Sequence, residues 1–334
     1  MAAQGKGIGP VVAALLGNSA VTLIKSAVAL SSGSSAMFSE AVHSFADTLN
    51  QALLLIGLRR SRKKADEEFG YGYGFERFFW ALISACGIFF VGAGVTIYHG
   101  ISSLQHPGAV SIDTTIFVVL FVAFAIESWT LIVAVRALRD AHPELSWRDR
   151  YTHADPTTLA VFLEDGIAVI GVIVAAAAIS ISYVTQNVAW DAWGSIAIGS
   201  LLAVAAVMLI VKNRQYLIGR SIPERDRMGI LELLAKESAI ERVIDFKSTV
   251  LDIGVYRIKC EVEFNGSALL DAEHQMGELR NDFEKIKNDY EEFKKFYVDY
   301  ADRVPRLIGK RIDEIESRIR DQFPKVRHID IEIN

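Results

Sequence analysis

The chain has 334 residues, of which 51% are hydrophobic and 22% are charged, and its mean hydropathy is +0.27. This composition excludes an ordinary soluble protein, because such proteins carry fewer apolar residues. The net charge of −5 says little about partners, since the first two thirds are apolar and the last third is rich in charge. The two cysteines, Cys86 and Cys260, indicate neither a disulfide framework nor a cysteine-type zinc knuckle.

Six apolar runs are long enough to cross a bilayer, which requires about 20 residues. The residues ahead of the first run are too few for a cleaved signal peptide, so we expect that run to remain as a span. Together the runs predict an all-α six-helix transmembrane domain over residues 1–212. The predicted spans are Ile8–Leu30, Ala36–Leu58, Phe78–Leu104, Thr114–Leu138, Thr157–Val184 and Ala192–Val211.

The distribution of basic residues predicts the topology. The connections after the second, fourth and sixth spans are basic, whereas Gln105–Ile112 and Tyr183–Trp190 contain no Lys or Arg. Because positively charged loops stay in the cytoplasm, we expect both termini to face the cytoplasm. The basic residues are Arg59, Arg60, Arg62, Lys63, Lys64, Arg136, Arg139, Arg148, Arg150, Lys212, Arg214 and Arg220.

The second span carries a polar stripe inside an apolar run. Glu40, His43, Asp47 and Asn50 are three or four residues apart, so a helix places them on one face. Ionisable groups in hydrocarbon are costly and typically mark an ion or substrate path. An imidazole and a carboxylate one turn apart also supply half of a tetrahedral metal site. The alternative is a hydrogen-bonded seam between helices that binds no metal.

Further ionisable residues lie in other spans. The fifth span begins at Asp155-Pro156, a helix-start pattern in which we interpret Asp155 as a structural N-cap. Two acids, Glu164 and Asp165, then lie near the middle of this apolar span. Lys25 lies in the first span and Glu127 in the fourth.

From about residue 213 the composition becomes that of a soluble domain. Two alternating apolar runs separated by Asp252-Ile-Gly254 predict a β-hairpin. We predict a cytoplasmic α+β domain over residues 213–334, in the order α-β-β-α-β, with a helical insertion at about 267–304. The expected elements are a helix at Pro223–Lys236, strands at Val243–Val250 and Val255–Phe264, helices at Ser267–Tyr300 and Arg306–Phe323, and a strand at Lys325–Ile333.

Several short motifs resemble one family of membrane proteins. They are Ser39–Asp47 (SEAVHSFAD), Tyr71–Gly74 (YGYG), Glu164–Gly166 (EDG) and Trp190–Ser195 (WDAWGS). With six spans and a soluble α+β domain, the chain resembles the cation diffusion facilitators over nearly its whole length. The EDG motif and the helical insertion are similar to the branch that includes the animal mitochondrial zinc exporter. The resemblance implies a homodimeric metal/proton antiporter with a metal site between the second and fifth spans.

The sequence departs from the family pattern in several places. The family has a histidine four residues before the aspartate of the fifth span, whereas Val161 precedes Asp165 here. A His-Pro-x-Gly-His motif is replaced by Phe69–Tyr73, so no peripheral metal site is expected in that loop. In the soluble domain, a weak cytoplasmic metal site is an option, although plain strand structure is favoured. Its candidate residues are Glu261, His328 and Asp330.

Zinc prefers four nitrogen, sulfur or oxygen ligands in a tetrahedron. Three candidates follow from the motifs, and the fourth must come from Glu164, Glu127 or water. We favour Glu164, because it is adjacent to a ligand in sequence; alternatively it pairs with Lys25. Glu40 and Asn50 are interpreted as lining the pathway or supporting the ligands. The three candidate ligands are His43, Asp47 and Asp165.

The expected function is secondary transport that exports a divalent transition metal in exchange for protons, with Zn²⁺ favoured and no resident cofactor. The same ligands also suit Fe²⁺, Co²⁺ or Mn²⁺, but they argue against Ca²⁺, which prefers six to eight oxygens. An intramembrane metalloenzyme is disfavoured, because no His-Glu-x-x-His motif is present. A membrane-anchored metal sensor or scaffold is the other alternative. The expected partners are divalent metal ions, protons, the lipid of a bacterial inner membrane and a second copy of the chain, but no nucleic acid.

Overall fold

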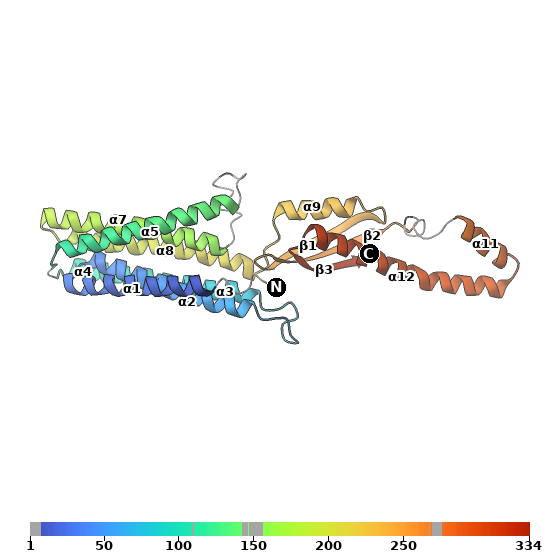
Figure 1. The fold of residues 1–334 in the computed structure, drawn as a ribbon, viewed down its shortest axis with the longest axis horizontal. Helices are drawn as coiled ribbons and strands as arrows, with labels where there is room; N and C mark the ends of the chain where they lie inside the picture. Colours follow the sequence, from blue (N-terminus) through green and yellow to red (C-terminus); the bar gives the residue numbers. More distant parts are fainter. Residues whose placement is uncertain (1–7, 109, 142–145, 147–155, 267, 269–275) are drawn as a thin grey trace. The chain divides into compact units, whose positions relative to one another are not determined.

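The computed structural model of the chain describes residues 8–108, 110–141, 146, 156–266, 268 and 276–334. The chain divides into two compact units, of which the first ends at Ile218 and the second comprises Gly219–Asn334. The first unit is a group of long helices that run side by side, and the second combines helices with a small sheet (Figure 1). Asp155, the predicted N-cap of the fifth span, lies outside the described residues.

The helices of the first unit coincide closely with the predicted apolar runs. One run is interrupted: between α3 and α4 the backbone adopts a π-helix, η1, in which hydrogen bonds join residues five apart. The elements are α1 (Ile8–Ser32), α2 (Ser35–Ser61), α3 (Phe75–Gly87), η1 (Ile88–Val95), α4 (Thr96–Gln105), α5 (Thr114–Ala141), α7 (Pro156–Thr185) and α8 (Ala189–Leu217).

Among the described residues, five helical segments are long and apolar enough to cross a membrane. They lie in α1, the continuous α3–η1–α4 segment, α5, α7 and α8. Large apolar side chains on these helices are exposed, such as Phe90 at 70% and Phe121 at 72%, as a lipid-facing surface requires. The second predicted span, α2, is not among the five because its stripe makes it more polar. Its role as the sixth span stays a prediction.

The start of α2 is fastened to the start of α8. Asp191, in the first turn of α8, accepts hydrogen bonds from the Ser34 hydroxyl at 2.7 Å and from the amides of Ser35 and Ala36 at 2.5 and 3.2 Å. One turn further along α2, the hydroxyls of Ser39 and Ser195 lie 2.6 Å apart. Small residues allow this close approach of helices and satisfy backbone groups that hydrocarbon cannot solvate.

The second unit is a three-stranded sheet covered by helices. Its strand order is β1-β2-β3, in which β1 and β2 are antiparallel and β2 and β3 are parallel. Alternate residues of β2, from Tyr256 to Val262, are buried, as a strand with one covered face requires. The elements are α9 (Glu224–Ala235), β1 (Ile240–Asp252), β2 (Val255–Phe264), α11 (Met276–Ile286), α12 (Tyr290–Gln322) and β3 (Val326–Ile333).

The helices of the predicted insertion differ from the expectation. We expected separate helices at Ser267–Tyr300 and Arg306–Phe323, but α12 runs without a break from Tyr290 to Gln322 through Pro305. A proline inside a helix removes one backbone hydrogen bond, which made a break the natural expectation. The helix continues because Leu307, Ile315 and Ile319 bury one face of its second half against the sheet domain.

A buried carboxylate joins α12 to the loop that follows α9. Glu237 is 4% exposed and accepts charged hydrogen bonds from Arg311 and Arg318. Burial alone would raise the pKa of Glu237, but the two guanidinium groups outweigh it and hold the pKa below its usual range. The stabilisation by these two ion pairs is therefore fully present above the pKa that Glu237 has in the unfolded chain. It is lost as the pH falls through the lower pKa that Glu237 has in the folded chain.

Replacing this anion should destabilise the second unit. We expect Glu237→Gln to cost about 2 kcal/mol, because hydrogen bonds to charged groups are lost in a buried position. Amide hydrogen exchange of β1 and β2 in the full chain measures the loss of stability. The difference between the variant and the wild type should shrink at low pH. The control is Glu232→Gln, whose pair with Lys236 is exposed and should matter by less than about 0.5 kcal/mol. Equal protection in the two variants would contradict the role of Glu237.

Candidate metal site in the helical unit

The polar stripe of α2 points into the interior of the first unit. His43 is 1% exposed, and its Nδ1 lies 3.6 Å from Oδ1 of Asp47, which is too long for a hydrogen bond. Neither ring nitrogen of His43 has a hydrogen-bond partner among the described residues. An unsatisfied buried polar group costs about 1–3 kcal/mol, so an imidazole left in this state is suited to an exogenous ligand.

The acids of α7 take different positions, as expected for neighbours about 100° apart on a helix. The Asn50 side-chain amide donates to both carboxylate oxygens of Glu164, at 2.7 and 2.6 Å. The Oδ1 atom of Asn50 in turn accepts a hydrogen bond from the Ser84 hydroxyl on α3. Glu164 is therefore oriented toward α2 by a chain of hydrogen bonds that crosses three helices.

Asp165 lies beside a groove of about 510 Å³ between α2, α5 and α7. The groove is also lined by Gln51, Thr130 and Val161, so the valine that replaces the family histidine faces the same space. Asp47 is close enough to interact electrostatically with both Glu164 and Asp165. Asp47, Glu164 and Asp165 therefore belong to one electrostatic neighbourhood, and Asp165 lines the groove.

Lys25 is completely buried and bridges two acids from other helices. Its ammonium lies 2.9 Å from Oε2 of Glu40 and 2.8 Å from Oε1 of Glu127. The sequence left open a pair between Lys25 and Glu164, but the structure instead pairs Lys25 with Glu40 and Glu127. Sequence reasoning had found no partner for Glu127, because the contact joins residues 102 positions apart.

The candidate ligands are neighbours but do not form a finished metal site. In the part of the chain that the structure describes, no group of three or more His, Cys, Asp or Glu side chains is arranged to hold a metal ion. Binding a metal would therefore require side-chain rotation around His43 and Asp47. The donor set itself, one imidazole and several carboxylates, is the kind that Zn²⁺ accepts.

The candidate residues of the second unit lie on the sheet face opposite its buried side chains. His328 and Asp330 lie two residues apart on β3 and therefore share one face of the sheet. Asp330 accepts hydrogen bonds from Arg257 at 3.1 and 2.9 Å. Burial, and then the charge of Arg257, lower the pKa of His328. Glu261 is opposite Asp245 on β1 and Glu332 on β3. The bond to Arg257 gives Asp330 a structural role that needs no metal.

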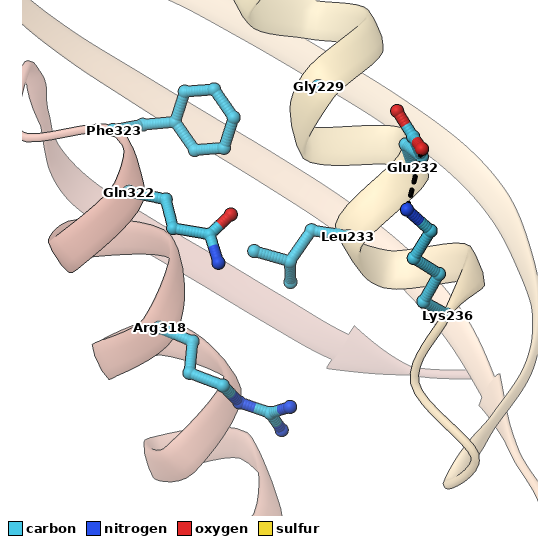
Figure 2. A pocket seen from close by; sticks show the side chains of 7 residues that line it. All are labelled: Gly229, Glu232, Leu233, Lys236, Arg318, Gln322 and Phe323. Atoms are coloured by element: carbon cyan, nitrogen blue, oxygen red, sulfur yellow. Dashed lines mark hydrogen bonds and ion pairs between the residues drawn. The ribbon is translucent and has the colours of Figure 1, made fainter.

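A second cavity, of about 380 Å³, lies between α9 and α12 (Figure 2). Figure 2 shows Phe323 and Arg318 on one wall, facing Leu233 and the ion pair between Glu232 and Lys236 on the other. Among the described residues, Glu232 is the only acid of its lining, and these residues include neither histidine nor cysteine. The cavity therefore lacks the donors that a transition-metal site needs.

Sequence reasoning missed three residues that shape the helical unit. Ser84 holds Asn50, Asp191 fastens α2 to α8, and Gln51 lines the groove with a buried side-chain oxygen that has no partner among the described residues. Each is a polar residue within or at the edge of an apolar run. A polar residue within an apolar run can therefore be flagged from the sequence as structurally or functionally important, but its partners cannot be identified in this way.

Comparisons with known proteins identify relatives over most of the chain. Residues 11–218 match the cation efflux transmembrane domain. The chain is 36% identical to metal tolerance protein C4 of Arabidopsis thaliana, over 96% of this chain and 72% of that protein. It is 33% identical to the mitochondrial proton-coupled zinc antiporter SLC30A9 of mouse and of human, over 90% of this chain. The chain spans only 54% of the length of these antiporters.

A bundle of apolar helices with an acidic and histidine-containing interior defines an integral, multi-pass membrane transporter for metal cations. The chain belongs to the cation diffusion facilitator family, as the resemblance of its motifs predicted. Members of this family are transporters and not enzymes, which confirms the expectation of no enzymatic activity.

The hydrogen bonds of Asn50 generate a prediction about metal affinity. Asn50→Ala leaves Glu164 unsupported, so we expect zinc affinity to fall by about 10- to 100-fold, as is typical when a residue that orients a ligand is lost. Zinc titration of the purified protein measures the effect. Thr48→Ala on the same helix removes a hydroxyl bonded to Ser44 and Thr22 and serves as the control. Unchanged affinity in Asn50→Ala would place Glu164 outside the metal site.

Proposed function

We propose that this protein is a secondary transporter that exports a divalent transition metal, preferentially Zn²⁺, from the cytoplasm in exchange for protons. The observation that carries the proposal is the buried His43, whose ring nitrogens have no hydrogen-bond partner in the described structure and which lies beside Asp47. The names of the antiporters that share 33% identity with the chain support both the metal and the exchange.

The ligands we propose are His43 and Asp47 of α2 with Asp165 of α7, and Glu164 is the favoured fourth. Glu164 is held toward α2 by Asn50 and interacts electrostatically with Asp47. Glu127 is the weaker candidate, because its contact with Lys25 has to be broken first. One imidazole among carboxylates also accepts Fe²⁺, Co²⁺ or Mn²⁺, so these metals are the alternative cargo.

Proton exchange follows from the chemistry of these ligands. A metal binds the deprotonated forms of carboxylate and imidazole, so metal entry releases protons and protonation releases the metal. If the site opens to one side of the membrane at a time, each cycle moves metal outward and protons inward. The protein needs no further cofactor for this cycle.

The groove indicates which side the described conformation serves. Besides Asp165 and Gln51, it is lined by Ala134 and Ala137 near the end of α5, which the positive-inside topology places toward the cytoplasm. At the other end of α2, Asp191 binds Ser34 and its neighbours tightly. We infer a conformation that accepts metal from the cytoplasm and is closed on the opposite side.

The proposal includes both termini in the cytoplasm, a homodimer and residence in a bacterial inner membrane. A membrane-anchored metal sensor or scaffold is the alternative function, with the second unit as its output. Metal uptake into sealed vesicles that contain only the pure protein separates the two functions, because a sensor moves no metal.

Loss of a ligand should abolish transport without unfolding the protein. We expect Asp47→Asn and His43→Ala to reduce zinc uptake by proteoliposomes by about tenfold or more, since even supporting residues change metal affinity by this amount. The control is Asp113→Asn, an acid that is exposed before α5 and only caps that helix. Normal uptake by Asp47→Asn would refute the proposed site.

Coupling to protons is tested separately. Zinc transport should acidify the compartment that the metal leaves, because each bound ion displaces protons from its ligands. During zinc uptake, a pH-sensitive dye inside the vesicles records the matching rise in pH of the lumen, which receives the metal and loses protons. Lowering the proton concentration in the lumen should slow transport. Vesicles without protein, and vesicles with the Asp47→Asn variant, provide the baseline. Zinc movement with no change in pH would exclude the exchange mechanism but would leave metal transport intact.

A further inference from the structure

Lys25 joins three helices inside the transport unit. The lysine lies on α1, and its two partners, Glu40 and Glu127, lie on α2 and α5. The side chains of Lys25 and Glu40 are 0% exposed, and that of Glu127 is 16% exposed. A buried lysine is costly unless it is paired, so this position requires both carboxylates or something that replaces them.

Each partner of Lys25 uses only one of its two carboxylate oxygens. The second oxygens, Oε1 of Glu40 and Oε2 of Glu127, are buried and have no hydrogen-bond partner in the described part of the chain. Glu127 also interacts electrostatically with His43, Asp47 and Asp165. Glu127 thus carries, beside the proposed metal ligands, an oxygen that is unpaired in the described structure, while its other oxygen is paired with the ammonium of Lys25.

We propose that Lys25 is a positioning residue: a tethered cation that withholds Glu127 from the transported metal. This inference rests on the proposed function. The affinity of an oxygen site for a divalent cation increases with the number of charged ligands, and conduction or transport requires that the ion also leaves. By pairing with one oxygen of Glu127 and offsetting its charge, Lys25 limits the acids around the metal and keeps binding weak enough for release.

Two rival roles fit the same contacts. Lys25 could be a purely structural brace, in which case removing it weakens folding and metal binding together. Alternatively, Glu127 could be a direct ligand that is shared between Lys25 and the metal. Loss of Lys25 weakens zinc binding if Lys25 is a brace and strengthens it if Lys25 withholds Glu127. Loss of Glu127 weakens zinc binding strongly only if Glu127 is a direct ligand, so variants of both residues separate the three readings.

The experiment measures zinc chloride binding and zinc uptake by the purified full chain with Lys25→Met, Glu127→Gln and the double variant. With all three groups ionised, the trio carries one net negative charge, and the double variant keeps that value. We expect Lys25→Met to lower the zinc Kd by on the order of tenfold or more, because Glu127 is released toward the site. Its uptake at saturating zinc should be slower than that of the wild type, because release becomes limiting.

The other two variants test the cause. Glu127→Gln should leave the zinc Kd within about threefold of the wild type, because Lys25 already withholds that carboxylate. The double variant should return to a similar Kd, since the released acid is gone. Size-exclusion profiles establish that each variant is folded, and a large loss of affinity in Glu127→Gln overturns the proposal even where Lys25→Met aggregates.

Two results would overturn the proposal. One is a folded Lys25→Met protein that binds zinc no more tightly than the wild type. The other is a loss of more than tenfold in affinity in Glu127→Gln, which would make Glu127 a direct ligand while Lys25 is in place. Either result leaves the proposed function standing if the wild type transports zinc. Failure of the wild type to bind and transport zinc refutes the proposed function itself.

Discussion

Burying charge among apolar helices is the constraint on which the helical unit depends. An isolated charge in hydrocarbon is unstable, so each buried ionisable group needs a partner. Lys25 satisfies one oxygen each of Glu40 and Glu127, and Asn50 satisfies both oxygens of Glu164. The histidine of the α2 stripe is treated differently, because both its nitrogens are left without hydrogen bonds among the described residues. The described contacts therefore satisfy these acids at least in part and leave the imidazole of His43 without a partner.

The contacts between helices also explain why α2 can carry so many polar residues. Its beginning is held by Asp191, and Ser39 meets Ser195 within the bundle. Close to these contacts, Gly194 lies so near to α7 that a Cβ atom there would be 2.4 Å from that of Ala178. Tight packing of small residues holds these helices together. In soluble proteins the burial of large apolar side chains does this, but in lipid there is little hydrophobic force between helices.

Periodicity in the sequence was sufficient to predict what depends on one helix or strand alone. The stripe of α2, the long apolar helices and the alternation along β2 all follow from spacings of 3.6 and 2 residues. It could not identify the partners of Lys25, for which a pair with Glu164 was the alternative considered, because the actual pairs with Glu40 and Glu127 depend on how α1, α2 and α5 pack. The continuity of α12 through Pro305 was missed for a similar reason, since tertiary burial outweighs a local preference for a break.

The π-helical segment η1 divides the α3–η1–α4 span into two parts with different attachments. On one side, Ser84 of α3 holds Asn50 and through it Glu164. On the other, Ser103 of α4 is bonded to Ser35 at the anchored start of α2. A π-helix has a wider turn and looser backbone bonding than an α-helix, and glycines at 92 and 94 lie within it. A change in backbone hydrogen bonding within η1 would therefore alter how the contact that supports Glu164 is aligned with the contact at the start of α2.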